Sequence, residues 1–191
     1  MQGDYKLKTK NQKLKLRDSK KLTESQREEW FAWIKREKKE GRIYYSVVSI
    51  QPKTVDRINV TASANRAAGR AIRNVLEKSG VNLKQVRIRL DGGIYPSLKT
   101  SAEGGPAFGG EIHSTKTVIK GDEKIPAISL ASIVAKVTRD RYMVRLAKRF
   151  PKYGFEKHKG YGTRMHRVRI KKHGISPHHR LTFLKKYTTL G

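Results

Sequence analysis

Apolar residues recur at helical spacing in the first part of the chain. Trp30, Trp33 and Ile34 lie three and four positions apart, which places them on one face of a helix. The preceding run Thr23-Glu24-Ser25-Gln26 is typical of a capping box, in which the Thr and Gln side chains bond free backbone amides at the helix start. We therefore predict a helix from this run to about Glu40.

The same kind of pattern predicts further helices. Residues 54–79 are rich in alanine, and we expect a helix with a break near Asn59 and a stop at Gly80. Gly174 is typical of a helix end, and Ser176-Pro177 of a new helix start. A long helix is expected from Lys120-Gly121-Asp122 to Pro151, with one apolar face made by Leu130, Ile133, Val134 and Val137.

Three shorter stretches have strand composition. Residues 43–50 (IYYSVVSI), 86–90 (VRIRL) and 114–119 are rich in β-branched or aromatic residues. Residues 92–110 are dense in Gly, Ser and Pro and predict a flexible loop. Residues 1–17 show no strand or helix period, so a basic tail or linker is expected there. The pattern predicts one α/β domain over residues 18–191, with a basic helical extension from about residue 151.

Composition bounds the class of protein. The 191 residues are 36% hydrophobic, which suffices for one core of ordinary size. No stretch has the roughly 18 apolar residues of a membrane span, and the N-terminus lacks the apolar centre of a signal peptide, so we expect a cytoplasmic protein without a membrane partner. The absence of cysteine excludes disulfides, thiolate catalysis and cysteine-based zinc sites.

Charge indicates a polyanionic partner. The chain has 44 Lys and Arg against 16 Asp and Glu, a net charge of +28. Cations gain affinity for nucleic acid by releasing the counterions condensed on its phosphates, which gives no sequence or substrate specificity. A ribosome-associated RNA-binding protein and a merely solvated basic surface are alternatives that charge alone leaves open.

Two aspartates are candidates for phosphodiester chemistry. Asp91 ends a predicted strand before Gly92-Gly93, and Asp122 lies between a predicted strand and a helix. Carboxylates at such rigid ends can hold Mg²⁺ or Mn²⁺ ions that activate water and stabilise the leaving oxygen. The alternative is structural, since an Asp after a strand is commonly a turn former or a helix cap.

Two segments are candidates for nucleic-acid contact. The run from Tyr153 to Thr163 interleaves aromatic residues with Lys, His and Gly, which suits stacking on sugars or bases beside phosphate contacts. Asp18-Ser19-Lys20-Lys21-Leu22 precedes a helix start, where amides and lysines can hold a phosphate. The alternatives are core aromatics in the first segment and an ordinary capping turn in the second. The six histidines lack a familiar zinc spacing.

Taken together, the motifs resemble ribonuclease HII, in order and over residues 17 to about 184. The matching stretches are Arg17-Asp18-Ser19-Lys20-Lys21-Leu22, Leu90-Asp91-Gly92, Lys120-Gly121-Asp122, Ala131-Ser132-Ile133-Val134-Ala135-Lys136-Val137-Thr138-Arg139-Asp140-Arg141-Tyr142-Met143, Pro151-Lys152-Tyr153-Gly154-Phe155, His158-Lys159-Gly160-Tyr161-Gly162-Thr163 and Gly174-Ile175-Ser176-Pro177 with His179-Arg180 and Phe183.

The resemblance implies a ribonuclease H fold, a mixed sheet flanked by helices. It implies hydrolysis of the RNA strand of RNA/DNA hybrids, and cleavage beside single ribonucleotides in DNA, with Mg²⁺ or Mn²⁺. Asp91 matches the third metal-binding carboxylate of the family and Asp122 the fourth. Tyr161 matches an aromatic residue that packs on the deoxyribose beyond an RNA-to-DNA junction. Residues in other matching stretches are expected to lie near the nucleic-acid backbone: Ser19, Lys20, Lys159 and Arg180.

The sequence also departs from the family pattern. Family members carry a first strand with Asp-Glu-Ala-Gly-Arg-Gly, which supplies two carboxylates, and no such motif is present. We therefore expect a ribonuclease H-like domain without its first strand, as an N-terminally incomplete chain or one that uses a partner. The leading hypothesis is a ribonuclease HII endonuclease of reduced competence. The rival is a catalytically inactive module that binds hybrids or RNA, and the oligomeric state is open.

Overall fold

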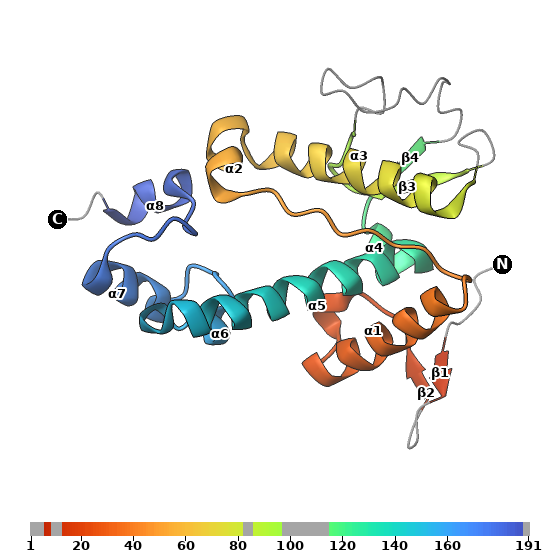
Figure 1. The fold of residues 1–191 in the computed structure, drawn as a ribbon, viewed down its shortest axis with the longest axis horizontal. Helices are drawn as coiled ribbons and strands as arrows, with labels where there is room; N and C mark the ends of the chain where they lie inside the picture. The colour runs from red at the N-terminus through yellow and green to blue at the C-terminus, as the bar shows by residue number, and fades with distance from the viewer. Residues whose placement is uncertain (1–5, 9–12, 82–85, 97–114, 189–191) are drawn as a thin grey trace. The chain divides into compact units, whose positions relative to one another are not determined.

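A computed structural model describes residues 6–8, 13–81, 86–96 and 115–188 (Figure 1). Side chains are described for residues 15–81, 86–96 and 115–184. The elements are β1 (Lys6–Lys8), β2 (Lys13–Lys15), the 3-10 helix η1 (Ser19–Lys21), α1 (Glu24–Lys39), α2 (Pro52–Ile58), α3 (Val60–Ser79), β3 (Ile88–Asp91), β4 (Thr115–Val118), α4 (Gly121–Lys124), α5 (Pro126–Arg149), the 3-10 helix η3 (Pro151–Tyr153), α6 (Phe155–His158), α7 (Arg164–His173) and α8 (Leu181–Thr188).

The chain divides into two compact units. Unit 1 comprises Met1–Val48 and Ala64–Ala135, and unit 2 comprises Ser49–Ser63 and Lys136–Gly191. The division falls inside α3 and α5 as well as between residues 48 and 49, so each unit contains segments that are distant in the sequence. It does not test the predicted domain over residues 18–191, which stays a prediction.

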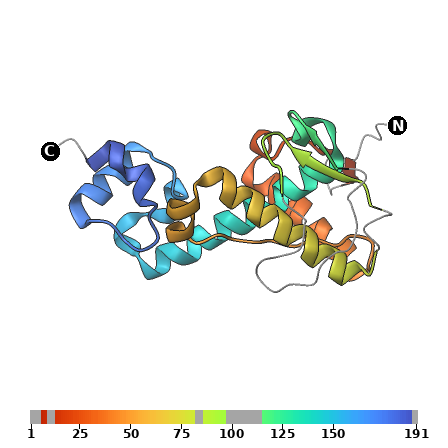
Figure 2. The same cartoon turned by 90° about the horizontal axis from the view of Figure 1, so that it is seen from above.

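The small sheet of unit 1 is parallel. Strand β3 pairs with β4, and Asp91 at the end of β3 lies opposite Val118 at the end of β4 (Figure 1 and Figure 2). The two strands correspond to the predicted strands at 86–90 and 114–119. Ser114 of the second predicted strand lies outside the described residues, as do residues 97–110 of the predicted loop. The α/β class is confirmed, while the described residues form two two-stranded sheets, this one and an antiparallel pair of β1 and β2, and not one larger mixed sheet.

Helix α1 begins as the sequence predicts. The Thr23 hydroxyl accepts a hydrogen bond from the Gln26 amide, and the Gln26 side chain accepts one from the Thr23 amide. Trp30 and Ile34 are almost fully buried in unit 1. The capping box therefore sets the start of the helix, and burial of its apolar face holds it in place.

Two predicted helices are interrupted. Asn59, with φ of 66°, separates α2 from α3 at the predicted break. The predicted helix from Asp122 to Pro151 is instead two helices, because α4 ends at Lys124 and Ile125 is extended before Pro126. Proline disfavours helical backbone in the residue before it, which accounts for the break. Among the described residues, no helix is both long and apolar enough to cross a membrane.

The core of unit 2 is aromatic. Leu146 and Ala147 of α5 are buried with Tyr153 and Phe155, whose rings stack at 5.3 Å between centroids. Tyr153 and Phe155 therefore have the core role that was the alternative to nucleic-acid contact. Phe150 and Met143 pack against this cluster.

Two predictions about strands are wrong. Residues 43–50 form no strand in the described structure: the Ser46 hydroxyl accepts a hydrogen bond from Asn74 of α3, and the Tyr45 ring contacts Phe31 of α1. A segment of strand composition needs a neighbouring strand to bond its backbone, and the described residues offer these residues none. Conversely, residues 1–17 contain β1 and β2, which pair antiparallel with Leu7 opposite Leu14. Each is an alternating Lys-Leu-Lys segment too short to show a period.

The predicted helix start at Ser176-Pro177 is also wrong. Ser176 begins a turn, with its carbonyl accepting from the His179 amide. Helix α8 begins at Leu181, where the Asp56 carboxylate of α2 accepts from the amides of Leu181 and Thr182 at 2.7 and 3.1 Å. The helix cap thus comes from a residue 125 positions away in the sequence, which local pattern cannot reveal.

Candidate active site

The parallel pair of strands brings Asp91 and Asp122 to the same edge of unit 1. Asp91 is the last residue of β3, and the turn after β4 leads through Lys120 directly into α4, which carries Asp122. The backbone N–H of Gly121 donates to Asp91 Oδ1 at 3.0 Å. Asp91 is thus bonded to Gly121, the residue directly before Asp122 in the chain, which brings the two candidate aspartates close together.

Gly121 permits this close approach. A Cβ atom at this position would lie 2.6 Å from Cδ1 of Ile128 and 3.5 Å from Asp91 Oδ1. The first distance is shorter than real carbon contacts, so a larger residue would displace the end of the Ile128 side chain. The glycine of the Lys-Gly-Asp motif is thus explained by packing at the site itself.

Asp122 has an unusual electrostatic environment. It is buried, and the Ser129 hydroxyl donates to its backbone carbonyl. Burial raises the pKa of the Asp122 carboxyl above its usual range, the nearby charges of Asp18 and Asp91 raise it further, and Lys20 opposes the rise. The Lys20 ammonium lies 4.0 Å from Asp122 Oδ2. A cation at this position would relieve the repulsion among the carboxylates.

Sequence reasoning missed Asp18 as part of this site. Asp18 is buried and caps η1, since its Oδ1 accepts from the Lys20 amide at 2.9 Å. Its carboxylate lies close enough to Asp122 to raise the pKa of the Asp122 carboxyl. The available signal was its place at the start of the Asp-Ser-Lys-Lys-Leu stretch, but a residue before a helix is usually a cap, and here Asp18 both caps and contacts the site.

The donor set fits a hard divalent cation. Carboxylate oxygens are the ligands that Mg²⁺ and Mn²⁺ prefer, and Asp91 retains an oxygen beyond the one bonded to Gly121. Within the described ranges, no group of three or more His, Cys, Asp or Glu side chains has the arrangement of a metal site. Asp91 and Asp122 therefore fit as a partial ligand set for a metal ion.

Ser19 and Lys20 have different environments. Ser19 is buried, and its hydroxyl lies 2.7 Å from that of Ser132 on α5. Arg27 of α1 donates to the Ser19 carbonyl at 3.0 Å and to that of Leu22. The Lys20 side chain is 80% exposed. The turn is thus fixed by inward bonds, while its lysine faces solvent beside Asp122.

Tyr161 is presented by unit 2. It is 55% exposed, with the Arg139 guanidinium 4.7 Å and the Lys136 ammonium 5.6 Å from the ring centroid. Lys136 also bonds Asp140 at 3.0 Å. Cations over an aromatic face are attracted by its quadrupole, so these residues restrain the ring while leaving much of it accessible.

A chain of histidines fixes the backbone of the Tyr161 loop. His166 Nδ1–H donates to the Tyr161 carbonyl at 2.9 Å, and His166 Nε2 lies 3.0 Å from His179 Nε2. His179 Nδ1 in turn accepts from the Ser176 amide at 2.9 Å. Burial lowers the pKa of His166 to about 4 and also lowers the pKa of His179. Both rings are therefore neutral at pH 7. The hydrogen bonds require this, because in each ring one nitrogen donates and the other accepts.

Lys159 and Arg180 also belong to unit 2. Lys159 follows α6 with a φ of 48°, two residues before Tyr161. Arg180 directly precedes α8, and its guanidinium lies 5.3 Å from the centroid of the Phe183 ring. The seven predicted site residues thus fall into two sets: Asp91, Asp122, Ser19 and Lys20 in unit 1, and Lys159, Tyr161 and Arg180 in unit 2.

Comparisons with known proteins agree with the resemblance. The family profile described as Ribonuclease HII matches residues 5–187. The chain is 40% identical over 168 residues to a protein named Ribonuclease HII from Shewanella halifaxensis, covering 88% of this chain and 71% of that protein. It is 39% identical to one from Desulfitobacterium hafniense (88% and 56% covered), and 38% identical over 175 residues to one from Caldicellulosiruptor bescii (92% and 74% covered). The chain thus spans between about half and three quarters of these relatives' lengths.

Proposed function

Because the chain belongs to the ribonuclease HII family, we propose that it hydrolyses the RNA strand of RNA/DNA hybrids and cuts at ribonucleotides embedded in DNA. The observation that carries this proposal is the contact of Asp91 with Gly121, which sets Asp91 beside the buried Asp122 in unit 1. Because the chain belongs to this family, it has the family's fold class and is an endonuclease of the ribonuclease H type. The substrate and the roles of the individual residues are our proposal.

We assign Asp91 and Asp122 as ligands of Mg²⁺ or Mn²⁺, in a reaction of the two-metal-ion type. Bound divalent ions supply an activated water and stabilise the charge on the leaving oxygen. The protein holds Asp91 by the Gly121 amide and Asp122 by burial in α4, so neither carboxylate has to reorganise when the substrate arrives. Lys20 offsets part of the negative charge and is exposed to contact a phosphate.

Tyr161 and the neighbouring cations would recognise the duplex. The exposed face of the restrained Tyr161 ring suits packing on a sugar that lacks a 2′-hydroxyl, and Lys159 and Arg180 suit contacts with phosphates. Ser19 is proposed to act through its backbone, because its hydroxyl is bonded to Ser132. These contacts position the duplex, and the RNA-to-DNA junction selects the bond that is cut.

The direct test is cleavage of a DNA duplex that carries one ribonucleotide, with Mn²⁺ or Mg²⁺ present. We expect metal-dependent cleavage at the ribonucleotide and none of an all-DNA duplex of the same sequence. Addition of EDTA should abolish the cleavage. Cleavage that persists in EDTA, or equal cleavage of the all-DNA duplex, would contradict the proposal.

A second candidate is a binding module without catalysis. It is favoured by the finding that the described residues contain no metal-ligating group of three or more side chains. This alternative predicts salt-sensitive binding of hybrid duplexes that is the same with Mn²⁺ and with EDTA. The cleavage assay separates the two candidates, because any metal-dependent cut at the ribonucleotide excludes the module.

A further inference from the structure

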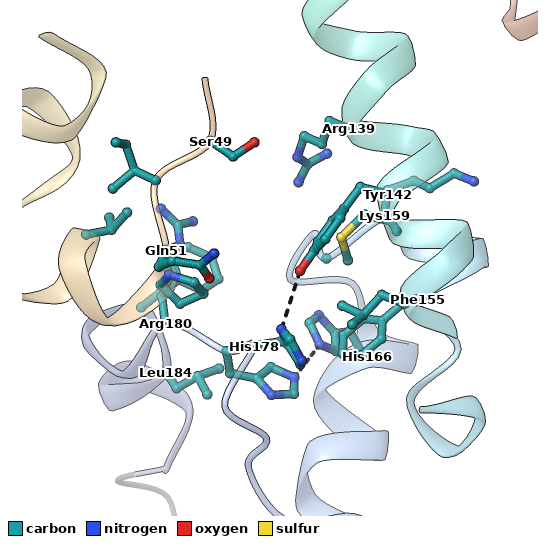
Figure 3. A pocket seen from close by; sticks show the side chains of 18 residues that line it. Ser49, Gln51, Arg139, Tyr142, Phe155, Lys159, His166, His178, Arg180 and Leu184 are labelled. Carbon is teal, nitrogen blue, oxygen red and sulfur yellow. Dashed lines mark hydrogen bonds between the residues drawn. The ribbon is translucent and has the colours of Figure 1, made fainter. Parts of the chain in front are cut away.

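Unit 2 contains a cavity of about 410 Å³ (Figure 3). Its lining includes Lys159 and Arg180, the two cations proposed above to contact phosphates, so an inference about it deepens the proposed function. Its walls come from four segments of this unit: residues 49–55, the second half of α5, residues 155–166, and residues 178–184. Ser49 and Gln51 lie on one side, and Arg139 and Tyr142 of α5 lie on the other. This volume is within the range of about 300–1,000 Å³ that is usual for small-molecule sites.

The charge of the cavity lining is one-sided. Arg139, Lys159 and Arg180 contribute three cationic groups, and no Asp or Glu is among the lining residues. Two carboxylates outside the lining interact with its cations: Asp140, bonded to Lys136, lies 3.9 Å from Arg139, and Asp56, which caps α8, interacts electrostatically with Arg180. His166 and His179 also line the cavity, and burial keeps both neutral at pH 7 by lowering their pKa. The cavity is therefore suited to a ligand with more than one negative charge.

The remaining walls are aromatic and apolar. Tyr142, Phe155 and Leu146 contribute to them, and Tyr142 is held by a bond of 3.4 Å between its hydroxyl and His178 Nδ1. Tyr142 is 44% exposed, so its ring is accessible for stacking. A planar base would find an aromatic surface here, and the amide of Gln51 and the hydroxyl of Ser49 could bond its polar edge.

We propose that this cavity binds one nucleotide, with its phosphate held by Arg180 and Lys159 and its base against Tyr142. The Arg180 guanidinium and the Lys159 ammonium match a phosphate better than a single carboxylate, since guanidinium binds phosphate oxygens in pairs. The nucleotide is either free or the unpaired end of a bound strand. The cavity belongs to unit 2, whereas Asp91 and Asp122 belong to unit 1. Binding of a nucleotide in the cavity requires no catalysis.

Titration of the full chain with AMP in EDTA tests the proposal, with inorganic phosphate and ribose 5-phosphate as reference ligands. We expect saturable binding of AMP at least about tenfold tighter than of either reference, because the base adds a stacking contact. AMP that binds no tighter than inorganic phosphate would overturn the site. Because metal is absent and no cleavage is measured, this outcome is independent of the proposed nuclease activity.

Two variants separate the cavity from diffuse attraction to a basic protein. Val55→Trp fills the cavity from α2 without changing any charge and should weaken AMP binding at least about tenfold, whereas Val168→Trp, at an exposed position of α7, should not. Arg180→Gln leaves the cavity open and should weaken AMP binding by a similar factor, whereas Lys148→Gln on the exposed face of α5 should not. Equal AMP affinity in all four variants would overturn the proposal.

Competition identifies the source of the nucleotide. If the site holds the end of a strand, a duplex with a one-nucleotide overhang should displace AMP more than about tenfold better than a blunt duplex of the same length. If the natural ligand is a free nucleotide, the two duplexes should compete equally and weakly. Both results leave the cavity as the AMP site, and each assigns it to one source.

Discussion

At the scale of single residues, Asp91 offers the sharpest test of the proposed reaction. Asp91→Asn keeps an oxygen that can accept from the Gly121 amide but removes the negative charge. We expect cleavage of the ribonucleotide-containing duplex to fall at least about 100-fold, with little change in thermal unfolding. The matched control is Glu123→Gln, an exposed acid beside Asp122 that is paired with Lys21. Unchanged cleavage in Asp91→Asn would remove this residue from the site.

His166 predicts a pH dependence of stability. The pKa of His166 is about 4 in the folded protein, against the ordinary value of 6.5 that applies to the unfolded chain. The His158 and His179 rings are its titratable neighbours. Between these values the unfolded chain binds more protons, so the free energy of unfolding falls as pH drops from 6.5 towards 4. Each such histidine contributes up to about 1.4 kcal/mol per pH unit.

Urea unfolding at pH 7 and pH 5 measures this effect. His166→Gln retains one donor and one acceptor but does not titrate, so its stability should fall less between the two pH values than that of the unaltered chain. The remaining loss would come from His179, whose pKa is also lowered. Identical losses in the variant and the unaltered chain would show that His166 is not the source.

The sequence predicted the positions of residues that have a single common structural role. It did not predict residues that combine a local role with a contact distant in the sequence. Asp91 ends a strand and Gly121 begins a helix, and local sequence signals indicated both positions. Ser19 was expected to lie near the nucleic-acid backbone, which stays a prediction, and the bond of its hydroxyl to Ser132, 113 positions away, had no local signal. Asp18 was matched only as part of a motif, because its contact with Asp122 depends on the fold.

At the scale of elements, the junction of β3, α4 and α5 depends on Gly121. Gly121→Ala would place a Cβ 2.6 Å from Ile128 Cδ1, so the end of the Ile128 side chain must move. We expect a loss of about 1–3 kcal/mol in the free energy of unfolding. Gly92→Ala is the control, since its Cβ would meet only Ile119 Cα at 3.7 Å and Val118 O at 4.0 Å. Equal stability of the two variants would contradict this packing argument.

Elements whose ends are set locally were the ones that the sequence predicted. The capping box of α1 and the break at Asn59 involve neighbouring residues, and both were correct. Residues 43–50 and the start of α8 failed for the opposite reason. A strand exists only with a partner, and α8 is capped by Asp56 from a distant helix. Tertiary contacts, which have no local pattern, decided both.

At the scale of the whole molecule, the net charge of +28 predicts how duplex binding depends on salt. Each phosphate contact releases counterions and adds about 0.9 to the slope of log affinity against log salt for B-form DNA. We expect a steep slope for a hybrid duplex measured in EDTA, where no cleavage occurs. Lys20→Gln removes one exposed cation beside the carboxylates and should reduce the slope by about 1.

The control variant and the metal dependence make this measurement decisive. Lys39→Gln, at the exposed end of α1, should leave the slope unchanged if the contact belongs to the site and not to the total charge. Repeating the titration with Ca²⁺, which occupies carboxylate sites, should tighten binding if Asp91 and Asp122 hold a metal together with the phosphate. If Lys20→Gln and Lys39→Gln change the slope equally and Ca²⁺ has no effect, binding is diffuse and the carboxylate edge takes no part in it.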